Sequence, residues 1–209
     1  MDGRAVRFHF NTFNHCADGR ACIEDLTIIL SAQLRALGHV VTSTDDGPFA
    51  SEGYNVLYES FADPGTIDRI AAARAEGGRF IYVATEEPTE EGCFGGRLDN
   101  AMRERQEAFV EAARYADGIL HLMPGARINA WYSRYAPSAY AELGYAEELV
   151  YRGPDVEPTF TFGFYGQMTP RRERILDELR RRSGEGILVL PFIIYSAAER
   201  DAEMRRAAV

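Results

Sequence analysis

The chain has 209 residues, and 46% of them are apolar, which is enough for one large domain or two small ones with a real core. Its net charge of −9 argues against nonspecific binding to nucleic acid or to an anionic membrane. All 23 basic residues are arginines, which excludes Schiff-base catalysis by lysine and a Walker A phosphate loop.

Strand-like and helix-like patterns alternate along residues 1–150. The predicted strands are Arg4–Asn11, Val40–Thr44, Tyr54–Glu59, Arg79–Thr85 and Gly118–Met123. The predicted helices are Ile23–Leu37, Pro64–Glu76, Asn100–Ala116 and Arg127–Arg134. This alternation implies a parallel sheet with right-handed crossovers. Such sheets bind ligands at the carboxyl ends of their strands, near the point where the strand order reverses.

The next segment, 151–158, contains a glycine and two prolines and is predicted to be a linker. The alternation then restarts with a strand up to Tyr165, a helix from Pro170, a strand near Ile187–Phe192, a helix from Ala197 and the start of another strand at 207–209. We therefore predict an α/β protein. A Rossmann-like parallel-sheet domain occupies 1–150, and an incomplete second Rossmann-like unit occupies 159–209.

The second unit opens with a glycine-containing turn between a strand and a helix. Gly163 and Gly166 permit backbone angles that residues with a Cβ resist. Thr169 suits the N-cap of the helix, and Pro170 suits its first position. A helix N-terminus after such a turn presents unpaired N–H groups to an anion.

Two arginines, Arg171 and Arg172, follow in the first helical turn. Their guanidinium groups are suited to forked hydrogen bonds with phosphate or carboxylate. The turn is therefore either the phosphate-binding part of a nucleotide-facing domain or an ordinary strand–helix turn with a solvated basic helix start.

Three stretches resemble a bacterial glycosyltransferase family with the GT-B architecture of two Rossmann-like domains. Phe162-Gly-Phe-Tyr-Gly-Gln-Met-Thr-Pro-Arg-Arg-Glu-Arg-Ile-Leu176 is similar to the opening of the family's second domain. Glu199–Val209 is similar to the helix that leads into the family's next strand. Residues 115–122, followed by Leu143-Gly-Tyr145, are similar to the last part of the acceptor domain. The resemblance is strongest over 103–209.

The resemblance implies an acceptor-side domain at 1–150 and the start of a nucleotide-sugar-binding domain at 159–209. The implied reaction moves a sugar from a nucleotide diphosphate sugar to an unknown acceptor. It uses no cofactor and no metal held by an Asp-x-Asp motif. The family's later donor-binding residues would lie beyond Val209, so the chain is expected to be a fragment of a longer enzyme.

On this interpretation, four residues bind the donor: Gly163, Gly166, Arg171 and Arg172. The expected partners are the nucleotide diphosphate sugar and the acceptor, with no nucleic acid. The unfinished sheet edge of the second unit also allows a homodimer.

The segment Asn11-Thr-Phe-Asn-His-Cys16 follows the first strand, at the edge where such sheets bind ligands. Asn11 and Asn14 are candidates for contacts with acceptor hydroxyls. His15 is a candidate general base near neutral pH. The alternative is a polar loop that only caps the next helix.

An acidic segment, Glu86-Glu87-Pro88, follows the strongest predicted strand. Glu86 is a second candidate base, and Glu87 is a candidate for orienting sugar hydroxyls. Because Glu90 and Glu91 follow closely, the alternative is a solvated acidic loop.

The cysteines, Cys16, Cys22 and Cys93, match neither a disulfide framework nor a zinc pattern, so we predict no metal site. The start of the chain is no signal peptide, and no apolar run reaches the roughly 18 residues of a membrane helix. These features predict a cytoplasmic protein without a membrane span.

Two other functions remain open at this point. The chain is alternatively a non-catalytic, Rossmann-like ligand-binding or interaction module, which an incomplete second unit favours. A nucleotide-sugar epimerase or dehydrogenase is disfavoured, because no Gly-x-Gly-x-x-Gly follows the first strand.

Overall fold

The structure is a computed structural model of the chain, and it describes residues 5–15, 17–96, 100–150, 153–154, 156–166, 168–183, 186–190 and 197–207. The chain divides into two compact units. The first comprises Met1–His15 and Leu30–Gly144, and the second comprises Cys16–Ile29 and Tyr145–Val209. Parts of the predicted linker, at 151–152 and 155, lie outside the described residues, as does the predicted strand end at 191–192.

The first unit is built on a six-stranded sheet in the order β2-β1-β3-β4-β5-β6, and every neighbouring pair is parallel. The strands are β1 (Arg7–Asn11), β2 (Val40–Thr44), β3 (Tyr54–Tyr58), β4 (Phe80–Ala84), β5 (Gly118–His121) and β6 (Ser138–Tyr140). The predicted α/β fold with a parallel sheet is confirmed. Since β1 lies between β2 and β3, the strand order reverses at the β1/β3 pair.

One strand of this sheet, β6, is absent from the sequence prediction. It spans only Ser138–Tyr140 and pairs with β5 at the sheet edge. Tyr140 is 46% exposed, so the strand lacks the buried, β-branched run that marks β4. A strand this short gives too few residues for a period-2 pattern.

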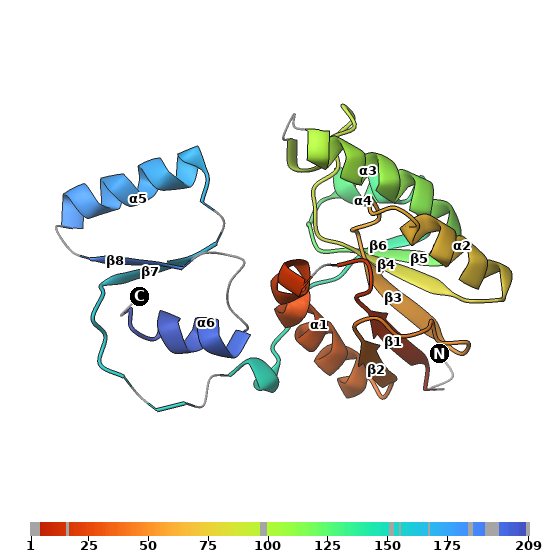
Figure 1. Ribbon diagram of the computed structural model, residues 1–209, viewed down its shortest axis with the longest axis horizontal. Helices are drawn as coiled ribbons and strands as arrows, with labels where there is room; N and C mark the ends of the chain where they lie inside the picture. Colours follow the sequence, from red (N-terminus) through yellow and green to blue (C-terminus); the bar gives the residue numbers. More distant parts are fainter. Residues whose placement is uncertain are drawn as a thin grey trace. The chain divides into compact units, whose positions relative to one another are not determined.

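The helices lie on both faces of the sheet, with α2, α3 and α4 on one face and α1 on the other (Figure 1). Their bounds are α1 (Ala17–Ala36), α2 (Thr66–Ala75), α3 (Asn100–Ala112) and α4 (Ala126–Tyr132), with short 3-10 helices η1 (Phe94–Gly96), η2 (Ala113–Tyr115) and η3 (Glu147–Leu149). Helix α1 begins at Ala17 rather than at the predicted Ile23. The added turns contain Asp18 and Gly19, which are weak helix formers and hide the helical pattern.

The main core lies between the sheet and α2, α3 and α4. Leu57 and Tyr82 project from the sheet into a fully buried cluster with Phe109 of α3 and Trp131 of α4. The rings of Tyr82 and Phe109 are 6.3 Å apart, and those of Phe109 and Trp131 are 6.4 Å apart. Because side chains alternate along a strand, the neighbouring residues of β3 and β4 face α1 instead.

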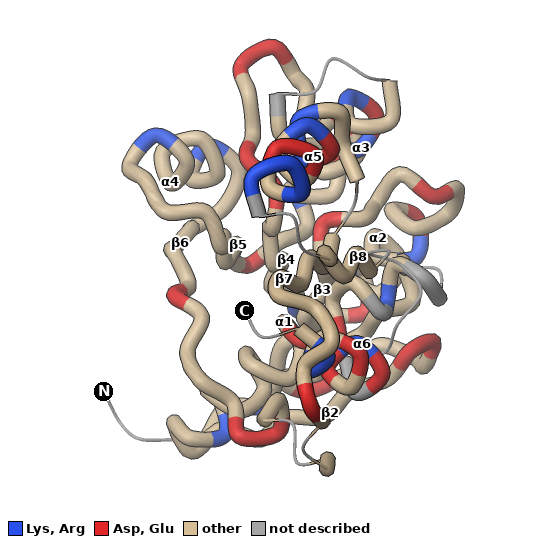
Figure 2. The backbone as a smooth tube through the Cα atoms, turned by 90° about the vertical axis from the view of Figure 1, so that its left-hand side faces the viewer, with Lys and Arg blue, Asp and Glu red and all other residues tan. Residues whose placement is uncertain are grey.

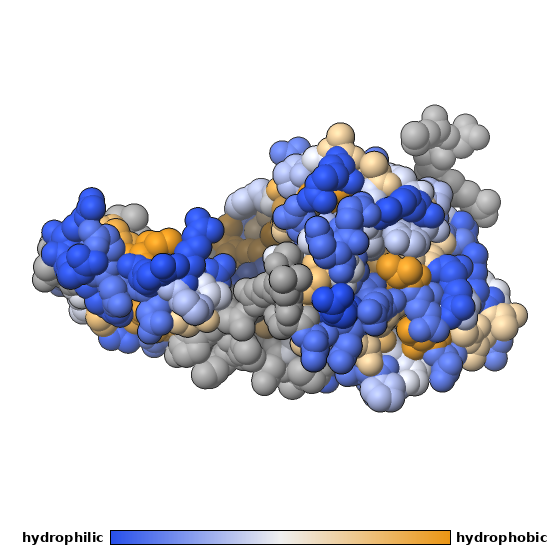
Figure 3. Space-filling view, turned by 90° about the horizontal axis from the view of Figure 1, so that it is seen from above, coloured by the Kyte–Doolittle hydropathy of each residue, from blue (hydrophilic) through white to orange (hydrophobic). Residues whose placement is uncertain are grey.

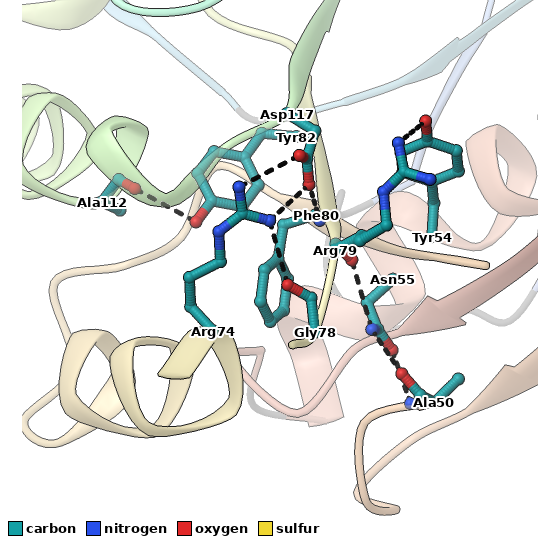
Figure 4. Close-up of polar contacts among 10 residues, drawn as sticks. All are labelled: Ala50, Tyr54, Asn55, Arg74, Gly78, Arg79, Phe80, Tyr82, Ala112 and Asp117. Carbon is teal, nitrogen blue, oxygen red and sulfur yellow. Dashed lines mark hydrogen bonds and ion pairs between the residues drawn. The ribbon is translucent and has the colours of Figure 1, made fainter. Parts of the chain in front are cut away.

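The amino edge of the sheet holds a closed polar network (Figure 4). Asp117, just before β5, accepts two hydrogen bonds from Arg74, at 2.8 and 3.1 Å, and one from the amide of Phe80, at 2.8 Å. Asn55 accepts from the amide of Ala50 at 2.7 Å and donates to its carbonyl at 3.0 Å. These contacts fix the starts of β3, β4 and β5.

The second unit contains a parallel pair of strands, β7 (Phe162–Tyr165) and β8 (Ile187–Leu190), with α5 (Pro170–Ser183) and α6 (Ala197–Met204). The predicted cap of α5 is confirmed: Thr169 Oγ1 accepts from the amide of Arg172 at 3.3 Å, and the helix starts at Pro170. Ala207 forms an isolated parallel bridge with Phe160, consistent with a strand starting there.

The first part of α1 belongs to this second unit. Arg200 of α6 forms an ion pair with Asp25 of α1 and another with Asp201, at 2.6 Å. The Arg200 guanidinium also lies over the ring of Tyr165, 5.4 Å from its centre. These contacts attach α1 to the carboxyl end of β7.

Among the described residues, no helix combines the length and apolar content needed to cross a membrane.

Candidate functional site

The candidate site lies at the carboxyl edge of the six-stranded sheet. The segments that follow β1, β3 and β4 meet there, because these strands are parallel neighbours. They contribute the loop Asn11–His15, the acid Glu59, and Thr85 with Glu86. The β1/β3 reversal point, where ligands of open α/β sheets bind, is part of this edge.

The asparagines of the β1 loop are buried and engaged inside the fold. Asn11 is fully buried, donates to Gly47 O at 3.2 Å, and accepts from the Phe13 amide at 3.1 Å. Asn14 is 2% exposed and donates to the carbonyls of Tyr58 and Ser60, both at 2.8 Å. These bonds tie the loop after β1 to the end of β3.

The oxygen end of the Asn14 amide differs from its nitrogen end. Its Oδ1 is buried and has no hydrogen-bond partner among the described residues. Buried polar atoms are rarely left in this state, and each such atom calls for a physical explanation. The next residue, His15, is half-buried, and its ring meets the ring of Tyr58 edge-on at a centroid distance of 6.1 Å.

Glu59 is the central acid of the edge, and it is absent from the residues predicted from the sequence. It follows β3 directly, and its side chain is only 2% exposed. Both its carboxyl oxygens are engaged by Thr85, one by the amide and one by the hydroxyl. Arg105 of α3 donates to its Oε1 at 3.4 Å.

Burial raises the pKa of Glu59 from 4.5 to about 7, although the bonds from Thr85 and the charge of Arg105 act in the opposite direction. A group with such a pKa changes protonation near neutral pH. Strongly shifted acids with a specific charge partner mark functional sites more often than chance.

Arg105 joins this buried acid to a second, half-buried acid, Glu86. Its second guanidinium nitrogen lies 3.6 Å from Glu86 Oε1, and the Glu86 side chain is 34% exposed. The backbone of Glu86 is fixed from the other side, because its carbonyl accepts from the hydroxyl of Tyr132 at 2.8 Å. Burial raises the pKa of the Tyr132 phenol above its usual range, so this group remains a donor.

The remainder of the acidic loop is paired with α4. Glu87 forms an ion pair with Arg127, and both oxygens of Glu90 lie within 3.4 Å of Arg134. The loop is therefore partly neutralised by the protein itself. Glu86 differs from these two, because its partner Arg105 also contacts a buried carboxyl group.

In the second unit, the predicted glycines have different environments. A Cβ on Gly163 would lie 2.8 Å from the Met204 side chain and 3.0 Å from that of Ala207, so α6 packs directly on the backbone there. Gly166 has φ = +152°, a conformation that favours glycine. This turn leads into α5.

Arg171 and Arg172 are exposed on the first turn of α5, and the Arg172 guanidinium lies 5.8 Å from the ring centre of Phe164. Arginines recur along this helix (Figure 2), at positions 171, 172, 174, 180, 181 and 182. They surround an exposed apolar patch formed by Ile175 and Leu179 (Figure 3).

Metal binding finds no support in the part of the chain that is described. Within it, His, Cys, Asp and Glu side chains form no group of three or more that could hold an ion. Cys16 lies outside the described residues.

No known family model matches the chain, and no curated protein sequence is significantly similar to it. Solved structures that resemble it include UGT2 of Phytolacca americana, in complex with UDP-2fluoro-glucose and pterostilbene. That match has 11% identity and a TM-score of 0.47, and covers 92% of this chain and 72% of the other.

A second match is UGT73P12 of Glycyrrhiza uralensis, in complex with glycyrrhetinic acid 3-O-monoglucuronide. It has 8% identity and a TM-score of 0.44, and covers 95% of this chain and 65% of the other. Scores below 0.5 at such low identity carry no argument about activity. The fold assignment therefore depends on the strand order and connectivity given above.

Proposed function

We propose that this protein takes part in the transfer of a sugar from a nucleotide diphosphate sugar to an acceptor hydroxyl. The observation that carries the proposal is the linked pair of carboxyl groups at the sheet's carboxyl edge, buried Glu59 and half-buried Glu86, joined by Arg105. The resemblance of Phe162–Leu176 to the opening of a GT-B donor domain supports this reaction class.

Glu86 is the first candidate for the general base. In the reaction, the base accepts the proton of the acceptor hydroxyl while that oxygen bonds to the anomeric carbon. The bond from the anomeric carbon to the diphosphate breaks, and the diphosphate leaves with the electron pair. The Arg105 guanidinium, 3.6 Å from Glu86 Oε1, helps to hold this carboxyl group in place for proton transfer.

Glu59 acts as a positioning residue in this proposal. It is too buried to touch a substrate, but it holds Arg105 on one side and the backbone of Thr85 on the other. Because Glu86 follows Thr85 directly, both contacts bear on where the Glu86 carboxylate lies. Removal of Glu59 is therefore expected to act through Glu86.

His15 is the second candidate base, and Asn11, Asn14 and Glu87 are the proposed acceptor contacts. The half-buried ring of His15 lies on the loop that Asn14 ties to β3. The engaged amides of Asn11 and Asn14 favour a role in shaping this loop. Their contribution to acceptor binding would then be indirect.

The proposed donor contacts are Gly163, Gly166, Arg171 and Arg172. Arg171 and Arg172 provide exposed guanidinium groups at the N-terminus of α5, where the helix dipole also favours an anion. Gly166 allows the turn that leads to this helix, and Gly163 allows α6 to pack on β7.

The test has two measurements on the full chain. Calorimetric titration with UDP-, GDP- and dTDP-sugars measures donor binding, and release of nucleoside diphosphate in the presence of an acceptor library measures transfer. Glu86→Gln is expected to lower kcat by about 100-fold or more without weakening donor binding. His15→Ala is tested beside it.

The matched control is Glu91→Gln, in an exposed acid of the same loop, which should leave both measurements unchanged. Full activity of the Glu86→Gln, His15→Ala double variant would rule out both candidate bases. Saturable binding of one nucleotide sugar with no transfer would favour the non-catalytic ligand-binding module. Absence of binding to all three classes, both by this chain and by a longer protein that contains it, would contradict the proposed function.

A further inference from the structure

The face of the six-stranded sheet that lies against α1 contains an apolar cavity of about 200 Å³. Its walls come from neighbouring strands and from the C-terminal half of α1: Phe10, Val56, Val83, Leu120, Leu30 and Leu34. We call this space the α1 cavity. It lies entirely within the first unit.

The other face of the same sheet shows how closely this protein packs when helices cover it. There, Leu57 and Tyr82 are fully buried among the side chains of α2, α3 and α4. Facing α1, the adjacent residues Val56 and Val83 are also shielded, at 2% and 0% exposure, yet they border the cavity. The α1 cavity is partly open at the surface, so a small molecule can reach its apolar lining.

The size of the cavity defines the size of its ligand. An apolar cavity of about 150 Å³ in an engineered protein accommodates benzene. The α1 cavity is somewhat larger, which fits one aromatic ring with a small substituent. A nucleotide or a disaccharide is too large for it.

The lining defines the charge and polarity of that ligand. The polar residues among those that line the cavity are Gln33 and Glu142, and Gln33 Nε2 already donates to the Glu142 carbonyl at 3.1 Å. Among the described residues no arginine lines the cavity, so a carboxylate or phosphate would be buried without a partner. Glu142 itself would repel an anion.

We propose that the α1 cavity is a binding site for a neutral, apolar molecule the size of a single aromatic ring. The proposal is independent of sugar transfer, because no residue of the candidate functional site lines the cavity. The predicted ligand is apolar, whereas the candidate functional site at the carboxyl edge of the sheet is polar and favours polar ligands.

The test uses benzene as the probe and benzoate as its charged counterpart. Methyl NMR signals of Val56 and Val83 in the full chain report occupancy directly. Saturable shifts are expected with benzene, at a Kd of about 1 mM or below, and no saturable shifts are expected with benzoate.

Two variants locate the binding. Leu34→Trp fills the cavity from the helix side and should weaken benzene binding by about tenfold or more. Leu30→Phe provides a second filling variant if Leu34→Trp misfolds, as judged by circular dichroism. Leu37→Trp is the matched control, because Leu37 directly follows the same helix, is 73% exposed and is not in the lining.

Saturable benzene binding that is lost in a filling variant and kept in Leu37→Trp would support the proposal. Absence of saturable shifts in the unmodified protein would overturn it, whatever the variants do. Equal binding of benzoate would overturn the assigned charge. Clearly tighter binding of a long-chain alcohol would overturn the assigned size.

Discussion

The buried polar groups at the two edges of the six-stranded sheet differ in how completely they are hydrogen-bonded. At the amino edge, Asp117 receives hydrogen bonds from Arg74 and Phe80, and both ends of the Asn55 amide are paired with Ala50. At the carboxyl edge, Asn14 Oδ1 and Arg105 Nε are buried with no hydrogen-bond partner among the described residues.

This difference separates a structural network from the candidate functional site. Buried polar groups are nearly always satisfied, and exceptions in native proteins often belong to catalytic or binding sites. At the amino edge, the side chains of Asp117 and Asn55 are hydrogen-bonded, and their bonds fix where the strands begin. The carboxyl edge contains both such unpartnered atoms and Glu59, whose pKa is raised to about 7. Parallel sheets bind ligands at this edge.

The largest effect that tests this comparison is the pH dependence of Glu59. Its pKa is about 7 in the folded protein and near its ordinary value of 4.5 in the unfolded chain. Between these two values the folded protein keeps a proton that the unfolded chain has lost, so the free energy of unfolding falls as pH rises. The full difference corresponds to about 3 kcal/mol, lost between roughly pH 4.5 and 7.

Urea unfolding of the unmodified protein and of Glu59→Gln at pH 5, 6, 7 and 8 measures this contribution. The free energy of unfolding of the variant should depend less on pH than that of the unmodified protein. The difference between the two proteins should be largest at an end of the pH series. A control, Glu111→Gln, changes an exposed acid on α3 and should retain the slope of the unmodified protein. Identical slopes for Glu59→Gln and the unmodified protein would show that this acid is not the titrating group.

Some of this arrangement was accessible from the sequence, because it depends on local signals. The strands β1 to β5 and β7 follow from apolar runs, and the start of α5 follows from Thr169 and Pro170. The position of Glu86 at the carboxyl edge follows from the strong strand that precedes it. Such features need only neighbouring residues.

The link between Glu59 and Arg105 could not be predicted in this way. Nothing local separates Arg105 from Arg103 in the same charged helix, and only the packing of α3 brings Arg105 to the sheet. Glu59 follows a buried strand, as Glu86 does, and that signal was available. Its burial, however, results from the pairing of β3 with β4, which brings Thr85, directly after β4, to its carboxyl group.

A smaller effect is expected from Asp117→Asn at the amino edge. The substitution removes the charge that faces Arg74 and leaves one of the present donors without an acceptor. Arg74 is 38% exposed, so solvent reduces the loss, and we expect about 2 kcal/mol of destabilisation. Donor binding and transfer should be unchanged, since the edge is structural.

The measurement for Asp117→Asn is urea unfolding beside the activity assay. Glu111→Gln again serves as control, because its exposed pair with Arg114 should contribute less than about 0.5 kcal/mol. A loss of transfer that exceeds the loss of folded protein would mean that the two edges are not functionally separate.

The smallest expected effect is a loss of stability when an asparagine is replaced, and each edge of the sheet offers one asparagine for this test. Asn14→Ala removes two hydrogen bonds, but Tyr58 O still accepts from the Ser60 amide at 2.8 Å, so we expect a loss of about 1 kcal/mol. Asn55→Ala should cost more, because Asn55 is fully buried and both of its side-chain bonds to Ala50 disappear, although Arg79 O still accepts from the amide of residue 55. Thermal unfolding ranks the two variants, and hydrogen exchange at Phe13 and His15 reports on the β1 loop. Faster exchange at Phe13 and His15 in Asn14→Ala, but not in Asn55→Ala, would fit a loop held for function. A larger stability loss in Asn14→Ala than in Asn55→Ala would reverse the assignment of the two edges.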